Sequence, residues 1–242
     1  MSTSSLRLPW LDQARGIAIL AMMAFHTCFD LTYWHLASFN MLDDGRWIWT
    51  RNLIVTLFLA IMGISLVLGQ GQSRRHFWLR LGRIGAAALL ISVVTWFMFG
   101  ERFIYFGVLH FVVVASLLAS LLRHWLPKPG IWIALGLLCL LTGLYPGLEA
   151  MDPRYLNWIG LTTHKPPTED YVPLLPWLGV VLLGMALGTR LASTPVTPPL
   201  PTSRPGKGLA WMGRHSLLIY LLHQPLLMGL LGALAEILNK IK

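Results

Sequence analysis

The sequence is poor in charged residues and in cysteine. Only 12% of its 242 residues are Asp, Glu, Lys or Arg, against roughly 25% in an ordinary soluble domain. Its two cysteines, Cys28 and Cys139, both lie inside apolar runs. A hydrophobic share of 55% excludes a disordered chain, and two cysteines exclude a disulfide-stapled scaffold. The composition therefore indicates a polytopic membrane protein.

Acidic residues are scarce: 10 Asp and Glu stand against 19 Lys and Arg, which gives a formal net charge of +9. In a soluble protein this excess would suggest a nucleic-acid partner. In a membrane protein the positions of the cations matter more than their sum, because they set the orientation of the helices. We therefore expect the lipid bilayer, and no nucleic acid, as a partner.

Long apolar segments fill most of the chain. A membrane-spanning helix needs about 20 predominantly apolar residues. By this criterion the sequence predicts seven spans, at about 10–36, 50–69, 81–100, 105–126, 130–149, 173–191 and 209–238. We expect the first span to be retained and not cleaved as a signal peptide, because it carries Asp12 and Arg15. The prediction is an all-α helix bundle that forms one transmembrane domain over residues 1–242.

The charges in the connections favour a cytoplasmic N-terminus and an external C-terminus. Cations mark the connections that would then be cytoplasmic: Arg7, Arg74, Arg75, Arg80, Arg123, Lys128, Arg190, Arg204 and Lys207. Most acidic residues fall on the other side: Asp43, Asp44, Glu101, Glu149, Asp152, Glu169 and Asp170. The cytoplasmic segment 192–208 contains five prolines and is typical of an extended linker.

The first predicted helix is unusual in its ionisable residues: Asp12, Arg15, His26, Asp30 and His35. Such residues are expensive in a membrane and often mark function. His26 and Asp30 are four residues apart and share a helix face, which fits either a structural hydrogen bond or a carboxylate that orients a catalytic imidazole. His35 fits a functional residue or an interfacial histidine in an aromatic belt.

Two further histidines, His110 and His223, fall in predicted helices, and Arg214-His215 opens the last one. Each alone fits a histidine whose hydrogen bonds are satisfied within the bundle, but together they predict a polar path across the membrane. Gly184 and Gly188 form a small-xxx-small pattern, which is typical of close helix packing within the chain or in a homodimer. The sequence contains no P-loop, dinucleotide fingerprint, zinc-ligand spacing or nucleophile elbow, and we expect no metal.

Five segments in order carry a resemblance to a known family: LDQARGIA at 11–18, FLAIMGISL at 58–66, FGVLH at 106–110, DYVPLLPW at 170–177 and GRHSLLIYLLHQP at 213–225. They resemble the bacterial branch of the heparan-α-glucosaminide N-acetyltransferase catalytic family. Ten residues separate Arg15 from His26, and this spacing resembles the wider group of membrane acyltransferases with an Arg-x10-His motif.

This resemblance implies an enzyme of the bacterial inner membrane that moves an acetyl group from cytoplasmic acetyl-CoA to a sugar-like acceptor outside. His26 matches the histidine of the Arg-x10-His motif, whereas His35, in HLASFN at 35–40, resembles the essential histidine of the animal enzymes with one extra residue. The two precedents disagree about which histidine does the chemistry. The chain is also shorter than the animal enzymes, so a small envelope sugar or lipid-linked acceptor is more plausible than a heparan-like polymer.

The expected site follows from these matches and from the chemistry of acyl transfer, which needs a base or a nucleophile. The catalytic candidates are His26, His35 and Asp30, in that order for the two histidines. Guanidinium groups match phosphate geometry, so the candidates for CoA binding are Arg15, Arg83 and Arg214. The candidates for acceptor binding are His110, Asp170, Tyr171 and His223.

Two other functions fit parts of the sequence. Histidines on several membrane helices can ligate haem b, and His26, His110 and His223 are the residues for an electron-transfer protein. No helix, however, carries repeated paired histidines. Intramembrane charges also fit a transporter or a non-catalytic scaffold, but the sequence has no internal repeat that would suggest alternating access.

Overall fold

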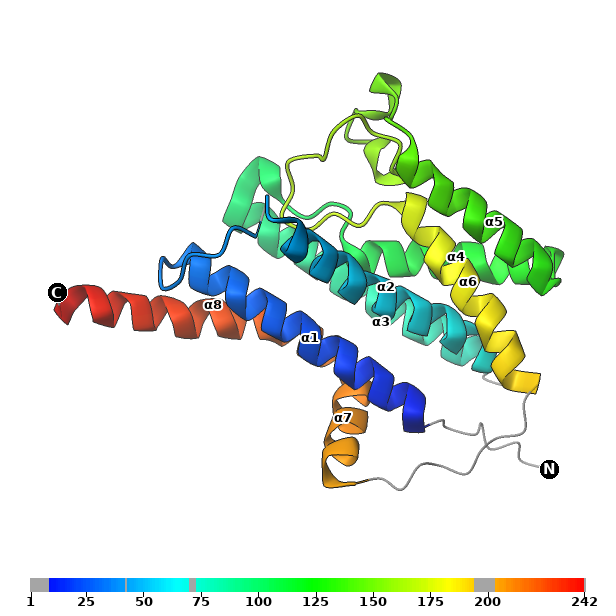
Figure 1. Ribbon diagram of the computed structural model, residues 1–242, viewed down its shortest axis with the longest axis horizontal. Coiled ribbons are helices and arrows are strands. Elements are labelled where there is room, and N and C mark those ends of the chain that lie inside the picture. Colours follow the sequence, from blue (N-terminus) through cyan, green and yellow to red (C-terminus); the bar gives the residue numbers. More distant parts are fainter. Residues whose placement is uncertain (1–8, 42, 70–72, 194–202, 242) are drawn as a thin grey trace. The chain divides into compact units, whose positions relative to one another are not determined.

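The computed structural model describes residues 9–41, 43–69, 73–193 and 203–241, and these residues form helices and connections without a strand (Figure 1). Helix, α and 3₁₀ together, accounts for 79% of the described residues. The α-helices of the described residues are α1 (Pro9–Tyr33), α2 (Gly45–Leu68), α3 (Arg74–Phe99), α4 (Val108–Trp125), α5 (Pro129–Leu141), α6 (Leu174–Ser193), α7 (Arg204–Arg214) and α8 (Ser216–Ile241). The all-helical, polytopic fold is confirmed.

Six helices in the described ranges are long and apolar enough to cross a membrane, and a shorter apolar helix covers Pro129–Leu144. The predicted fifth span, 130–149, was therefore too long. Helix α5 ends at Leu141 and continues only as the 3₁₀ turn η2 (Thr142–Leu144). Pro146 and Gly147 follow, and Gly147 has a φ of 92°, a conformation that glycine adopts without strain and that ends helical geometry.

Several helices begin earlier than the apolar runs alone predicted, because polar caps precede them. Ser73 accepts a hydrogen bond from the His76 amide at 3.3 Å and starts α3 seven residues before the predicted start at 81. Asp44 accepts from the Arg46 amide at 2.9 Å at the start of α2. The basic residues Arg74, Arg75 and Arg80 therefore lie in the first turns of α3 instead of in a connection.

The structure divides into two compact units. The α1–α8 unit comprises the described parts of residues 7–58 and 197–242, with α1, the first part of α2, α7 and α8. The α3–α6 unit comprises the described parts of residues 59–196, with the rest of α2 and α3 to α6. Each unit has its own close helix contacts.

Small residues bring the helices of the α3–α6 unit together. A Cβ at Gly184 would lie 2.5 Å from the backbone oxygen of Ala60, and one at Gly188 would lie 3.1 Å from Ile64, so α6 packs directly on the second part of α2. The Gly184-xxx-Gly188 pattern thus serves packing within the chain. Helices α5 and α6 lie side by side (Figure 1), where a Cβ at Gly179 would meet the Gly136 carbonyl at 2.5 Å.

The predicted last helix, 209–238, was wrong in one respect, because two helices occupy this region. Ser203 accepts from the Gly206 amide at 3.4 Å and caps α7, whose first turn holds Pro205. Proline is tolerated there because the first turn's amides have no partner inside the helix. The chain turns at His215 and continues as α8. The extended linker is thus replaced by helix at both ends, while Pro195, Pro198, Pro199 and Pro201 lie outside the described residues.

Helix α7 packs against the beginning of α1 (Figure 1). A Cβ at Gly16 would collide with the backbone of Leu209, and a Cβ at Gly213 would collide with the carbonyl of Asp12. Gln13 also donates to the Gly206 carbonyl at 3.3 Å. Because hydrogen replaces a side chain at both glycines, the two backbones can approach each other this closely.

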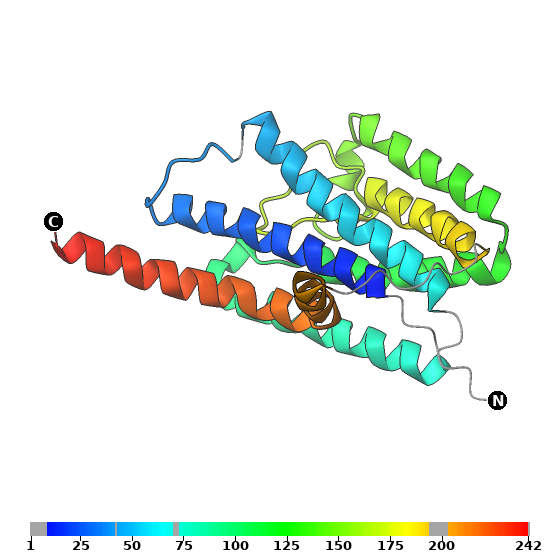
Figure 2. The same ribbon diagram turned by 60° about the horizontal axis from the view of Figure 1, so that its bottom comes forward.

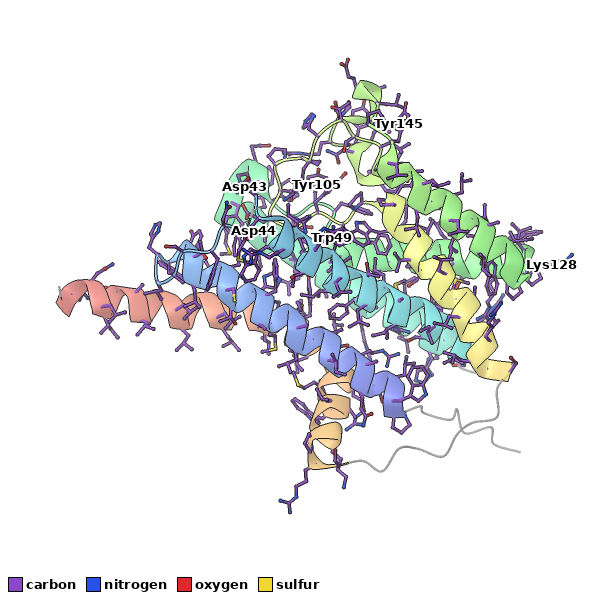
Figure 3. The ribbon with its side chains drawn as sticks, viewed as in Figure 1. Asp43, Asp44, Trp49, Tyr105, Lys128 and Tyr145 are labelled. Carbon is purple, nitrogen blue, oxygen red and sulfur yellow. The ribbon has the colours of Figure 1, made fainter. Side chains whose placement is uncertain are left out.

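Helices α1 and α8 run side by side in the same direction (Figure 2). His26 pairs with His223, Asp30 with Gln224, and Trp34 with Gly232, so residue numbers rise together along both helices. Successive membrane crossings alternate in direction. Seven crossings make the first and last parallel, whereas six would make them antiparallel. The parallel pair therefore favours α5 as a crossing, with Lys128 and Tyr145 at its opposite ends (Figure 3).

Topology reporters test this parity argument and the cytoplasmic N-terminus. We expect reporters fused after Ser73 and Lys128 to lie in the cytoplasm and one after Asp152 to lie outside. If the reporters fused after Lys128 and after Asp152 lay on the same side of the membrane, α5 would not cross it. An external reporter at Ser73 would instead reverse the orientation predicted from the cations.

The packing of α7 on α1 predicts opposite effects of one substitution at two glycines of α7. Gly213→Ala should lower the free energy of unfolding by about 1–3 kcal/mol, because the new methyl group overpacks the contact with Asp12. Gly208→Ala is the matched control, since among the described residues nothing lies within 4 Å of its Cβ position. It should be neutral or stabilise by up to about 1 kcal/mol through helix propensity. Thermal unfolding in detergent measures both, and equal shifts would contradict the packing.

Candidate active site

Helix α1 carries three of the predicted site residues, Arg15, His26 and Asp30, and ends just before a fourth, His35. The amides of His35 and Leu36 donate to the carbonyls of Thr32 and Leu31 at 3.1 and 2.9 Å. His35 has a φ of 58°, so it occupies the left-handed position of a Schellman motif, which glycine usually fills. Its side chain is exposed. His35 therefore terminates the helix, whatever its ring does.

The rings of His26 on α1 and His223 on α8 contact each other, with centroids 5.0 Å apart and planes inclined at 61°. His223 is 6% exposed. Its Nδ1 lies 2.7 Å from the carbonyl oxygen of Tyr220, one turn earlier on the same helix. Two of the predicted histidines, separated by nearly the whole sequence, thus meet in one place.

Asp30, one turn beyond His26, is completely buried. Its Oδ1 accepts a hydrogen bond from Nε2 of Gln224 at 2.7 Å. The residue that holds the Asp30 carboxylate in the structure is therefore Gln224 on α8, while His26 packs on the neighbouring His223. The hydrogen bond joins α1 to α8 at the same level as the histidine pair.

Four buried polar atoms at this contact have no hydrogen-bond partner within the described part of the chain: Asp30 Oδ2, Trp34 Nε1, His223 Nε2 and Gln224 Oε1. Leaving a buried polar group unpaired costs about 1–3 kcal/mol, and more if it is charged. Native structures contain few such atoms, so a cluster of them calls for an explanation. Bound water, or the polar groups of a substrate, would supply the missing partners. We refer to His26, Asp30, Trp34, His223 and Gln224 as the α1/α8 polar cluster.

The predicted CoA-binding arginines have different settings. Arg15 forms a 2.7 Å ion pair with Asp12 near the start of α1. At 1.5 Å per residue it lies about 16 Å from His26 along the helix axis. Arg214, at the end of α7, is exposed and belongs to the same unit. Arg83 is exposed on α3, in the α3–α6 unit.

His110 lies in the α3–α6 unit, and both its ring nitrogens have partners. The Gly107 amide donates to Nδ1 at 3.3 Å. Nε2 lies 3.1 Å from the Ser92 hydroxyl, which itself donates to the Ile104 carbonyl at 2.6 Å. Because the Ser92 hydrogen is used for Ile104, Nε2 must donate to Ser92 Oγ. These contacts tie the chain before α4 to α3.

Asp170 and Tyr171 hold the same unit together. Asp170 accepts from the Val108 amide at 2.9 Å and thereby caps α4 from a distant part of the sequence. Tyr171 donates to the Asn157 carbonyl at 2.6 Å, and Tyr105 donates to the Asn157 side chain at 2.9 Å. Burial raises the pKa of Tyr171, so its hydroxyl stays protonated and available as a donor.

The family model described as "Heparan-alpha-glucosaminide N-acetyltransferase, catalytic" matches residues 7–225. The chain belongs to this family. No curated protein and no solved structure matches it. The family consists of membrane acetyltransferases that depend on acetyl-CoA. The match extends from before α1 to Pro225 in α8, so it includes the whole histidine pair.

For an acetyltransferase, the α1/α8 polar cluster offers the necessary chemical groups. The two imidazoles can accept protons or carry an acyl group, and the carboxylate and amide can bind polar groups of a substrate. Among the described residues, no group of three or more His, Cys, Asp and Glu side chains is arranged to hold a metal ion.

Sequence reasoning missed Gln224 and Trp34 as members of this cluster. Gln224 had a signal, since it lies next to His223 in the motif LLHQP and an amide deep in an apolar helix needs a partner. Trp34 has no such signal, because an aromatic belt is the usual reason for tryptophan at a helix end. Only its contact with Gly232 shows that it faces α8.

The hydrogen bond between Asp30 and Gln224 predicts a measurable coupling. Asp30→Ala and Gln224→Ala should each destabilise the fold, and the double variant should lose less than their sum, with a coupling of about 1.5–3 kcal/mol for a bond to a charged group. Thermal unfolding of the three variants in detergent gives the cycle. Additive losses would mean that the two side chains do not stabilise each other.

Proposed function

We propose that this protein transfers an acetyl group from cytoplasmic acetyl-CoA to a sugar or sugar-like acceptor on the outer side of the bacterial inner membrane. The observation that carries the proposal is the α1/α8 polar cluster, in which two imidazoles touch and four buried polar atoms have no partner among the described residues. Family membership supports the chemistry, and the cluster supplies a place for it.

The acetyl donor would bind at the cytoplasmic end of α1. Arg15 and Arg214 belong to the same unit as the cluster and are our candidates for the phosphates of CoA, with Arg83 as a third. A guanidinium group matches phosphate geometry. The pantetheine arm would then extend along α1 toward His26, over the roughly 16 Å that separates it from Arg15.

The reaction requires removal of a proton from the acceptor and attack on the thioester carbonyl. A positioned base contributes about 10²–10⁴-fold to such a step. Within the cluster, His26 is our first candidate for a catalytic histidine, either as this base or as a nucleophile that carries the acetyl group. Asp30 and Gln224 offer unpaired oxygens to the hydroxyl or amino groups of the acceptor. Three further candidates for acceptor binding are His110, Asp170 and Tyr171. Their described contacts hold the α3–α6 unit together, so these contacts do not themselves support a role in binding.

Electron transfer through haem b is less well supported. A haem iron needs its two axial imidazoles on opposite faces of the porphyrin, but the rings of His26 and His223 touch edge to face at 5.0 Å. This contact leaves no space for a porphyrin between them.

Acetyl transfer in liposomes tests the proposed function. The purified protein is reconstituted, acetyl-CoA with a labelled acetyl group is supplied on one side, and glucosamine or glucose is supplied on the other as a probe acceptor. We expect labelled acetyl sugar to form only when acetyl-CoA is on the cytoplasmic side of the protein and the acceptor is on its outer side. Failure to transfer to either probe from either side would contradict the proposal.

Substitution of the two candidate histidines should distinguish their roles in this assay. His26→Ala should abolish transfer, by at least about 100-fold, with acetyl-CoA binding and the fold retained. His35→Gly should have a smaller effect, because glycine accepts the backbone conformation of residue 35 and removes only an exposed ring. Activity that survives in His26→Ala and is lost in His35→Gly would move the chemistry to the end of α1.

A further inference from the structure

The imidazole of His223 is fixed in one tautomer by the backbone of its own helix. A carbonyl oxygen can only accept a hydrogen bond, so the Tyr220 carbonyl, 2.7 Å from Nδ1, requires a hydrogen on that nitrogen. In the neutral ring the second nitrogen, Nε2, then carries a lone pair and no hydrogen. This is the arrangement in which a hydrogen bond at one nitrogen sets the function of the other.

That second nitrogen is buried, and within the described ranges no group donates a hydrogen bond to it. His110 shows the contrasting arrangement, with a partner at each nitrogen. His215 shares the first half of the His223 arrangement, since its Nδ1 lies 2.9 Å from the Trp211 carbonyl, but its ring is exposed to the surroundings. His223 therefore combines a fixed tautomer with a protected basic nitrogen.

We propose that His223 is the general base of the acetyl transfer. The inference rests on the proposed function and deepens it. Nε2 removes the proton from the hydroxyl or amino group of the acceptor while the oxygen or nitrogen attacks the carbonyl carbon of acetyl-CoA. The new C–O or C–N bond forms, the C–S bond breaks, and the CoA thiolate leaves. The proton on Nε2 then passes to this thiolate, which gives CoA and restores the neutral ring.

His26 is less well prepared for the same step. Its ring contacts His223, but among the described residues no hydrogen bond fixes its tautomer. A histidine in acyl transfer can act as a base or as a nucleophile. In the direct transfer written above only one base is needed, and the geometry assigns the proton to His223, with His26 packed on its ring. Loss of activity in His26→Ala is compatible with this assignment, because removing the His26 ring removes the group that packs on His223.

The decisive variant is His223→Asn. The amide nitrogen of asparagine can take the place of Nδ1 and donate to the Tyr220 carbonyl, but the side chain has no basic nitrogen. His215→Asn is the matched control, because it makes the same exchange at an exposed histidine with the same backbone contact. Both proteins are assayed in liposomes with glucosamine or glucose as the probe acceptor, together with acetyl-CoA binding and thermal unfolding.

We expect His223→Asn to bind acetyl-CoA and unfold like the wild type while kcat falls by about 100-fold or more. His215→Asn should keep full activity. Transfer at the wild-type rate in His223→Asn would overturn the assignment of the base and leave the proposed function intact. Absence of transfer in the wild type would instead overturn the proposed function, and the base assignment with it.

Nitrogen NMR of the wild-type protein gives a test that does not depend on turnover or on how the variants fold. With labelled histidine, and His223→Asn used to assign the signal, His223 should show a protonated Nδ1 and an unprotonated Nε2 at neutral pH. A hydrogen on Nε2 of the neutral ring would contradict the proposal, since that nitrogen could then accept no proton.

Discussion

The hydrogen bond between Asp30 and Gln224 is the interaction on which the arrangement of α1 and α8 depends. Lipid does not compensate polar groups inside a membrane, so a buried carboxylate must find its partners within the protein, in bound water or in a ligand. Gln224 supplies one bond to Asp30 at 2.7 Å and fixes α8 beside α1 at this level. The neighbouring contacts of His26 with His223 and of Trp34 with Gly232 then follow from one helix register. Within the described part of the chain, one oxygen of each side chain has no other partner. The contact that holds the helices together is therefore also the place where a polar ligand would be stabilised.

The long helices could be predicted from the sequence because apolar runs of about 20 residues have few alternatives. The caps were local signals that hydropathy overlooks: Ser203 followed by Pro205 marks the start of α7 within a segment that proline content alone assigns to a linker. Gly213 and Gly16 show why that helix packs on α1, since a side chain at either would collide with the neighbouring backbone. The end of α1 had a weaker signal, because His35 occupies a position that usually holds glycine.

The site was harder to predict, because its partners are distant in the sequence. Asp30 and Gln224 are 194 positions apart, whereas the local spacing of His26 and Asp30 suggested that these two would pair. A shared helix face shows only that two side chains can approach each other, and the neighbouring helix decides which partner each one takes. Likewise Asp170, which falls in a motif with Tyr171, caps α4 over a separation of 62 residues. A motif therefore identifies residues that matter without distinguishing those that hold the fold from those that do the chemistry.

His215 and His223 illustrate this distinction. Their Nδ1 atoms have the same kind of partner, but the surroundings of their Nε2 atoms differ. His215 and His223 each place Nδ1 on a carbonyl of the preceding turn, a contact with no functional meaning of its own. At His215 the ring is exposed, and surrounding groups can satisfy its other nitrogen. At His223 the ring is buried, and the contact at Nδ1 leaves the lone pair of Nε2 free of hydrogen. No described group donates a hydrogen bond to this lone pair. Burial in an apolar helix bundle thus turns an ordinary backbone hydrogen bond into a means of keeping a base ready, and the bundle needs no further residue to set the tautomer.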